Sequence, residues 1–151
     1  MGLTAFLLAF GAVLALDQVT KALLWGREGA LIPGVVNIAN VKNTGSAMGV
    51  LSFCPPWLLA AAAVAAIAGI AVYAAAARPG KTVRVALGCI AGGAAGNLAD
   101  RIFRGYVADL FETVFVKFYV FNAADAAIVI GCAVCAAAVL FGRGTDGEGR
   151  R

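Results

Sequence analysis

The chain has 151 residues, of which 62% are hydrophobic and 13% are charged, and its formal net charge is +4. A soluble domain is usually about 45–50% apolar and about 25% charged, so this composition is typical of a single membrane domain and gives no reason to expect a nucleic-acid partner. Histidine is absent, which excludes Ser-His and Cys-His catalysis as well as histidine-based zinc sites.

Four apolar segments are long enough to cross a bilayer, whose hydrocarbon core takes about 20 helical residues. The first, residues 4–25, could be a signal peptide, but it lacks a basic start and a clean small-x-small end, so we expect a retained helix. The others are residues 57–77, 85–104 and 121–141. Together they define a membrane domain over residues 1–142. The polar, glycine-rich tail that follows, 143–151, is expected to be disordered.

The orientation in the membrane follows from the basic residues. The short loop at 78–84 carries three basic residues and no acid, and the tail adds arginines. Because short basic loops stay in the cytoplasm, we expect this loop and both termini on the cytoplasmic side. The connections 26–56 and 105–120 then lie outside. The first holds a β-branched stretch, 35–42, that favours short strands, and the second is an aromatic-rich loop suited to a membrane interface.

Two aspartates near the outer ends of the helices are candidates for chemistry. Asp125 lies just inside the fourth segment, where a charge costs at least about 2.5–3.5 kcal/mol, so a function is expected unless it only caps a helix that starts at Asn122. Asp109 lies between apolar residues of an outer connection. Two close carboxylates share a proton, so that one can activate water while the other acts as an acid. Such a pair hydrolyses amides without histidine or metal, although two aspartates alone are a weak signal.

Other polar residues are spaced to share helix faces. Asn97, Asp100 and Arg101 fall at i, i+3 and i+4, and Arg101 could pair with Asp100 or hold another carboxylate. Asp17 and Lys21 are also four residues apart, which favours a salt bridge. For both groups a structural role and a functional role remain open.

Small and sulfur-containing residues are expected to pack. The spacing of Gly88, Gly92 and Gly96 predicts close approach of another helix to the third segment. The cysteines lie mostly in apolar runs, so we expect buried packing rather than metal binding or redox chemistry at Cys54, Cys89, Cys132 and Cys135.

Five motifs in order along the chain resemble those of the lipoprotein signal peptidase, or signal peptidase II, family: Asp17-Gln-Val-Thr-Lys21, Asn43-Thr-Gly-Ser-Ala47, Gly92-Gly-Ala-Ala-Gly-Asn-Leu-Ala-Asp-Arg101, Gly105-Tyr-Val-Ala-Asp-Leu-Phe111 and Phe121-Asn-Ala-Ala-Asp125. They cover essentially the whole chain except the tail. The resemblance implies an all-α integral membrane fold, with four transmembrane helices and a small extracytoplasmic β cradle over about 34–53.

The resemblance also implies the activity. It is that of a multi-pass aspartyl endopeptidase of the bacterial cytoplasmic membrane, whose site lies at the extracytoplasmic face. The enzyme removes signal peptides from diacylglyceryl-modified prolipoproteins, cutting just before the lipid-modified cysteine. It implies Asp109 and Asp125 as the catalytic pair. Residues with substrate-binding or supporting roles are Asp17, Lys21, Asn43, Gly45, Asn97, Asp100, Arg101 and Asn122. We expect contact with membrane lipids, a monomer, and no metal or cofactor.

One departure and several alternatives remain. Met48 and Gly49 stand where the family usually has Phe-Ser, which leaves the detailed shape of the cradle open. A Ser-Lys peptidase would use Ser46 with Lys42 or Lys21 as base. A small transporter or channel would use Asp125 and Arg101 as pathway residues, and a purely structural subunit would give the clustered acids and amides no role.

Overall fold

The computed structural model describes residues 3–45, 54–116 and 118–141. It contains the four helices expected from hydropathy: α1 (Thr4–Leu24), α2 (Pro56–Ala76), α3 (Lys81–Arg104) and α4 (Ala123–Phe141). Each is long and apolar enough to cross a membrane. The helix ends differ slightly from the apolar segments. α3 begins at Lys81 rather than 85 because the helix continues through a charged first turn that hydropathy does not mark.

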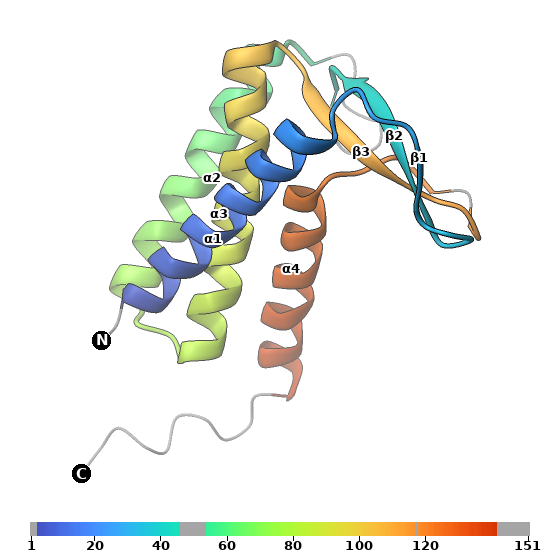
Figure 1. Ribbon diagram of the computed structural model, residues 1–151. Coiled ribbons are helices and arrows are strands. Elements are labelled where there is room, and N and C mark those ends of the chain that lie inside the picture. The colour runs from blue at the N-terminus through green and yellow to red at the C-terminus, as the bar shows by residue number, and fades with distance from the viewer. Residues whose placement is uncertain (1–2, 46–53, 117, 142–151) are drawn as a thin grey trace.

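α3 is the central helix, against which α1, α2 and α4 all pack (Figure 1). The expected role of its glycines is confirmed. A Cβ at Gly88 would lie 2.5 Å from the carbonyl oxygen of Phe6, and one at Gly92 would lie 2.5 Å from that of Phe10. The backbones of α1 and α3 therefore touch, which only small residues permit.

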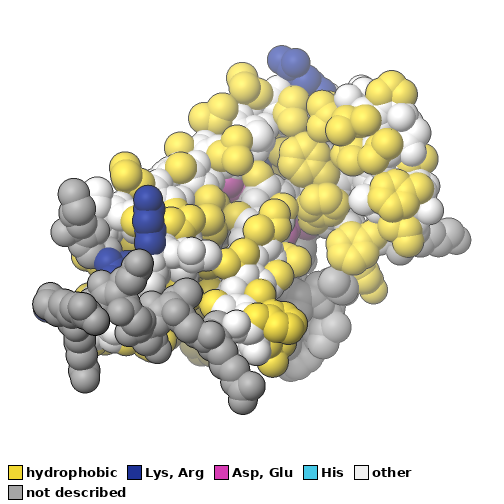
Figure 2. Space-filling model, turned by 90° about the horizontal axis from the view of Figure 1, so that it is seen from below, with side chains coloured by type: hydrophobic (Ala, Val, Ile, Leu, Met, Phe, Trp, Pro, Cys, Tyr) yellow, Lys and Arg dark blue, Asp and Glu magenta, His cyan; other side chains and the backbone are white. Residues whose placement is uncertain are grey.

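The distribution of side chains is that of a membrane protein. Large apolar residues face outward on the helices, for example Leu8 at 69% exposure and Val139 at 85%. Hydrophobic side chains are exposed over much of the face shown in Figure 2. The largest fully buried side chains include charged and polar ones, such as Lys21 and Asn122. Because lipid cannot satisfy polar groups, they gather where the protein itself supplies their partners.

A small antiparallel sheet extends sideways from one end of the bundle (Figure 1). Its strand order is β1 (Gly29–Ile32), β2 (Val36–Asn43), β3 (Val107–Thr113). The strand expected within 35–42 is confirmed as β2. Residues 46–53 of the expected cradle, including Met48 and Gly49, lie outside the described residues.

The interpretation of residues 105–120 as a loop was wrong, because Val107–Thr113 form β3. Residues 107–110 are all buried, so this strand shows no alternation of polar and apolar residues that a sequence could reveal. Its pairing with β2 brings Val41 opposite Asp109. The catalytic candidate Asp109 is therefore carried by a strand in the interior of the protein.

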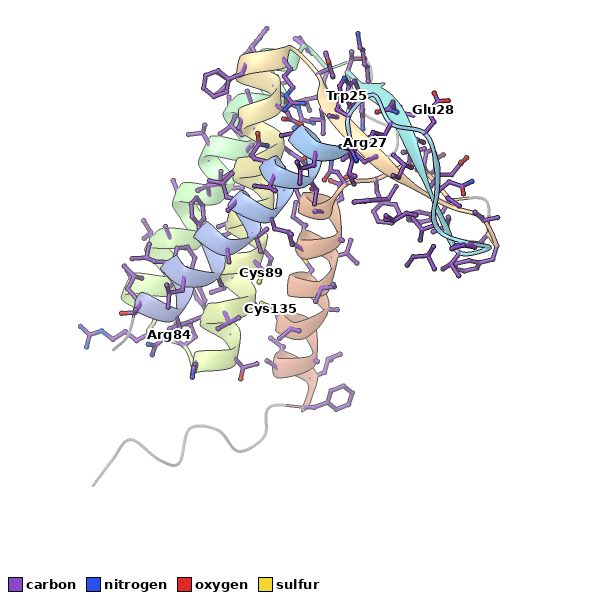
Figure 3. The ribbon with its side chains drawn as sticks, viewed as in Figure 1. Trp25, Arg27, Glu28, Arg84, Cys89 and Cys135 are labelled. Carbon is purple, nitrogen blue, oxygen red and sulfur yellow. The ribbon has the colours of Figure 1, made fainter. Side chains whose placement is uncertain are left out.

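The cysteines also differ from expectation. All four thiols are free, but Cys132 is exposed and Cys54, Cys89 and Cys135 are only half-buried. Figure 3 shows Cys89 on α3 and Cys135 on α4, in the half of the bundle away from the sheet. An apolar environment suits a thiol on the lipid-facing surface of a span as well as it does in a core, so hydropathy could not distinguish the two.

Candidate active site

The two candidate aspartates come from different elements and line one cavity. Asp109 lies on β3 and Asp125 in the first turn of α4. The cavity has a volume of about 980 Å³ and is bounded by the end of β2, by the turn at 44–45 and by α4. The tertiary structure thus brings together two carboxylates that lie sixteen residues apart in sequence and belong to separate elements.

Asp125 is oriented by the cap of its own helix. Its backbone N–H donates to Oδ1 of Asn122 at 2.9 Å, while the Asn122 N–H donates to Oδ2 of Asp125 at 3.2 Å. This reciprocal arrangement is a capping box, so the capping role considered from the sequence is present. The remaining oxygen, Oδ1 of Asp125, accepts a hydrogen bond from Nδ2 of Asn97 at 2.8 Å. Capping therefore holds the carboxylate in place at the cavity wall.

Asp109 is held by two asparagine side chains. Nδ2 of Asn122 donates to its Oδ1 at 2.7 Å, and Nδ2 of Asn43 donates to its Oδ2 at 2.9 Å. Burial, assisted by the charge of Asp125, raises the pKa of Asp109 to about 6 against the lowering effects of the two asparagine donors and Lys21. Asp109 is only 2% exposed. Asp109 therefore retains its proton at mildly acidic pH.

Asn97 and Asn122 connect the two carboxylates. Nδ2 of Asn122, which donates to Asp109, also lies 3.1 Å from Oδ1 of Asn97. Asn97 in turn donates to Asp125. A chain of amides thus runs from one carboxylate to the other, and such a network holds its members in one arrangement when each polar atom has a partner.

Behind the asparagines lies a buried ion cluster. Nζ of Lys21 is 2.8 Å from Oδ2 of Asp17 and 2.8 Å from Oδ2 of Asp100, and all three side chains are fully buried. The salt bridge expected between Asp17 and Lys21 is confirmed. Its third member, Asp100, comes from α3 and also lies 3.4 Å from Nε of Arg104. Gln18 donates to Asp17 at 3.0 Å and so completes the cluster on α1.

Arg101 interacts electrostatically with Asp125 and Asp109, but its hydrogen bonds within the described residues go to backbone oxygens. Asp100 pairs with Lys21 and Arg104, whereas Arg101 donates to the carbonyl oxygens of Gly45 at 3.0 Å and Asn97 at 3.3 Å. Asp100 and Arg104 are four residues apart and share one face of α3, whereas Arg101 is the next residue after Asp100 and does not, so the helical period itself favours Arg104. Arg101 instead holds the turn that follows β2.

That turn supports the asparagine beside Asp109. The Gly45 N–H donates to Oδ1 of Asn43 at 3.0 Å, and Nδ2 of Asn43 points to Asp109. Arg101 therefore supports Asp109 indirectly, because it holds Gly45, which holds Asn43. Lys42, considered as a base, lies with Nζ 5.1 Å from the centre of the Tyr106 ring, and Ser46 lies outside the described residues.

The apolar part of the cavity was not foreseen from the sequence. It is formed by the segment 118–121 and by Ile128, Val129 and Ile130 of α4. Val129 is 67% exposed and Ile130 is 63% exposed, so the cavity extends to the outer surface of a candidate membrane span. The one signal in the sequence was the run of aromatic residues before α4. Such a run suits a membrane interface as well as a cavity wall, and composition does not distinguish the two.

Comparison with known proteins identifies the family. A family model described as signal peptidase II matches residues 9–141. The chain belongs to the signal peptidase II family. Relatives named lipoprotein signal peptidase include those of Geobacillus thermodenitrificans, 39% identical over 83% of this chain and 82% of the relative, and Rhizorhabdus wittichii, 42% identical over 82% and 80%.

Solved structures agree with the fold. One, described as a bacterial membrane enzyme, has a TM-score of 0.82 and 25% sequence identity over 97% of this chain and 93% of that chain. A second, with the same description, has a TM-score of 0.79 and 28% identity over 89% and 92%. The signal peptidase II family consists of aspartic peptidases, so this multi-pass bacterial membrane protein is an enzyme of that class. The Ser-Lys, channel and structural-subunit interpretations are therefore wrong.

Proposed function

We propose that this signal peptidase II removes signal peptides from diacylglyceryl-modified prolipoproteins by cutting just before the lipid-modified cysteine, with Asp109 and Asp125 as its catalytic pair. The lipoprotein signal peptidase activity follows from the family. The choice of residues rests mainly on one observation: two carboxylates from separate elements line the same cavity. Peptide hydrolysis by a carboxyl pair requires this convergence.

The environments of the two aspartates support distinct roles. The raised pKa of Asp109 suits a protonated acid, because its burial disfavours the charged form. Asp125 lies at the amino end of α4 and accepts hydrogen bonds from the Asn122 N–H and from Nδ2 of Asn97, so we assign it the role of base. In the proposed reaction Asp125 takes a proton from water as the oxygen attacks the scissile carbonyl carbon. Asp109 donates its proton to the carbonyl oxygen, which gives a neutral tetrahedral diol.

Collapse of the diol reverses these proton movements. Asp125 gives its proton to the leaving nitrogen as the C–N bond breaks, and Asp109 recovers a proton from the diol hydroxyl that becomes the new carbonyl. Both groups return to their starting protonation states, and one water is consumed per bond cut. Asn43 and Asn122 keep both oxygens of Asp109 in place, and Asn97 does the same for Asp125.

The shape of the cavity supports a substrate that is partly embedded in lipid. Its polar end contains Asp109, Asp125 and Asn43, and its apolar end includes Ile128 and Val129 on the outer surface of α4. A lipid-modified cysteine would place its peptide bond at the polar end and its acyl chains at the apolar end. Burial of such chains contributes about 0.8 kcal/mol for each CH₂ group.

The distribution of charge supports the expected orientation. Arg84, in the basic turn of α3, lies at the end of the bundle opposite the sheet, whereas Trp25, Arg27 and Glu28 lie where α1 joins the sheet (Figure 3). Arg78 and Lys81 are exposed at that basic end. By the positive-inside rule, the aspartates then face the extracytoplasmic side of the cytoplasmic membrane, and both termini face the cytoplasm. A monomer without cofactor remains our prediction.

The test is cleavage of a purified diacylglyceryl prolipoprotein in proteoliposomes, followed by the mass of the released peptide. Asp109→Asn and Asp125→Asn keep the size of the side chain but remove proton transfer. Each should lower kcat at least about 10²-fold. Glu112→Gln is the matched control, since it changes an exposed acid on the same strand to an amide. It should leave the rate unchanged.

Two further variants separate the competing outcomes. Ser46→Ala should retain near-normal activity, because the proposed mechanism uses no serine. The same prolipoprotein without its diacylglyceryl group should be cut poorly. Cleavage that survives either asparagine change would refute the assigned pair, and equal cleavage of both substrate forms would refute the requirement for lipid.

A further inference from the structure

Three side chains behind the active site are fully buried and are not used in the proposed chemistry. Asp17, Lys21 and Asp100, here called the buried triad, are joined by two contacts of 2.8 Å to the lysine ammonium. Within the described chain, the cavity lining does not include them. They therefore cannot touch a substrate in the cavity, and any effect that they have on catalysis passes through other residues.

Each acid of the triad holds the backbone next to one catalytic aspartate. Oδ2 of Asp100 accepts a hydrogen bond at 3.0 Å from the N–H of Ala108, the residue before Asp109. Oδ1 of Asp17 accepts one at 3.1 Å from the N–H of Ala124, the residue before Asp125. The two contacts are equivalent in position, although they involve a strand and a helix.

We propose that the buried triad sets the distance between Asp109 and Asp125, with the Lys21 ammonium as the link between their two supports. This inference rests on the proposed catalytic pair. A continuous path runs from Ala108 through Asp100, Lys21 and Asp17 to Ala124. These are positioning residues, not catalytic residues. Their action depends on hydrogen bonds to backbone atoms that precede each catalytic side chain.

Lys21 has no spare capacity for another role. An ammonium group has three donors. Among the residues that the structure describes, its Nζ has three partners: Asp17 at 2.8 Å, Asp100 at 2.8 Å and Oδ1 of Asn97 at 3.4 Å. The third contact orients the Asn97 amide so that its nitrogen points to Asp125. Lys21 is thus linked to Asp125 by a side-chain route as well as by the backbone of α4.

The charge of the triad is accommodated where it lies. Two carboxylates and one ammonium leave a net charge of −1. Arg104 lies 3.4 Å from Asp100, and Asp17 meets an N–H group in the first turn of α4, where the helix dipole is positive. Each acid therefore has a second partner besides Lys21: Arg104 for Asp100 and the Ala124 N–H for Asp17.

Cohesion of the helices does not by itself explain the triad. Removing three ionised groups from water costs several kcal/mol for each ion, and well-packed apolar residues often stabilise as much or more. The same two helices already pack through Gly88 against Phe6 and through Gly92 against Phe10. Gly96, one turn further along α3, faces a side chain of α1 instead of its backbone: a Cβ there would lie 2.5 Å from Oδ2 of Asp17. Gly96 leaves room for the triad.

The test separates geometry from stability by balancing charge. Lys21→Met leaves two buried carboxylates without their partner, so it should lower both the melting temperature and kcat. In the double variant Asp17→Asn/Lys21→Met, one negative and one positive charge are lost together, so the net charge stays at −1. The amide oxygen introduced at position 17 can still accept from the Ala124 N–H, and Asp100 keeps Ala108 and Arg104. The melting temperature should therefore recover.

The proposal predicts that kcat does not recover with it. Because the ammonium link is still missing, kcat should remain about 10- to 100-fold below the parent, as expected for catalytic groups displaced by about 1 Å. KM should change less than about 2-fold, since the cavity lining is unaltered. The matched control is Lys81→Met, at an exposed lysine in the first turn of α3. It should change neither kcat nor KM.

Several outcomes decide the matter. Recovery of kcat together with the melting temperature would overturn the proposal and leave the triad a purely structural element. Should the double variant stay unstable, Gly96→Ala tests the same point without any change of charge, because its Cβ displaces the Asp17 carboxylate. A parent-like kcat in that variant would also overturn the proposal. Failure of the parent to cut the prolipoprotein would instead refute the proposed function itself.

Discussion

Replacing Asn43 by leucine removes one of the two side-chain donors to Asp109 while keeping the branched shape of the side chain. In the parent, Nδ2 of Asn43 lies 2.9 Å from Oδ2 of Asp109, and this donor lowers the pKa of a carboxyl group that burial has raised to about 6. The donor stabilises the ionised form, so its loss favours the protonated form. The pKa of Asp109 should therefore rise.

The size of the shift follows from the energy of the hydrogen bond. A hydrogen bond to a charged group contributes about 1.5–3 kcal/mol, and 1.36 kcal/mol corresponds to about one pKa unit. Asn43 is half-buried, so the lower end of this range applies. We expect an increase of about one unit.

The assay is the pH dependence of kcat/KM, which reports ionisation in the free enzyme. If Asp109 is the acid of the pair, activity in the parent should fall as the pH rises through about 6, because the proton needed by the carbonyl oxygen is lost. In Asn43→Leu this alkaline limb should move about one unit to higher pH.

The acid limb should stay in place, and Asn37→Leu, the same change elsewhere on β2, should leave the whole profile unaltered. A shift of the acid limb instead would mean that Asp109 is the ionised member. An unchanged profile would refute the role given to Asn43.

Three other changes test the helix packing, the attachment of the sheet and the cap of α4, the first and third by thermal unfolding in detergent. Gly92→Ala should destabilise the protein by about 1–3 kcal/mol, because its Cβ would lie 2.5 Å from a backbone oxygen. The control Gly69→Ala meets nothing within 4 Å and should be neutral or stabilising. Equal effects of the two changes would contradict the close contact of α1 and α3. Asn40→Ala removes hydrogen bonds to Gly26 and Arg27 that tie β2 to the end of α1, so hydrogen exchange in β1 should speed up while exchange in α3 stays unchanged. Asn122→Ala should lower the free energy of unfolding by about 1–2 kcal/mol, because the cap of α4 is lost. It should also lower kcat, because Asp109 loses one of its two side-chain donors. A normal kcat would show that the asparagine network does not orient the two aspartates.

Hydropathy and the order of the motifs were sufficient to predict the four helices and the family. The helices follow from the length of the apolar runs, because in lipid a spanning segment must satisfy its own backbone hydrogen bonds. The glycines of α3 could be interpreted from their spacing, and the Asp17–Lys21 bridge from the helical period. Each of these features depends on residues close together in the chain, where geometry is nearly fixed by the helix itself.

The contacts of the site were decided by the tertiary structure. β3 has no strand period because its residues 107–110 are all buried, so pairing with β2 was needed to define it. The contact of Lys21 with Asp100, and the path from Ala108 to Ala124 that it completes, depend on how α1, α3 and α4 meet. Distances between groups on different elements are set by packing, and a pattern within one element carries no information about them.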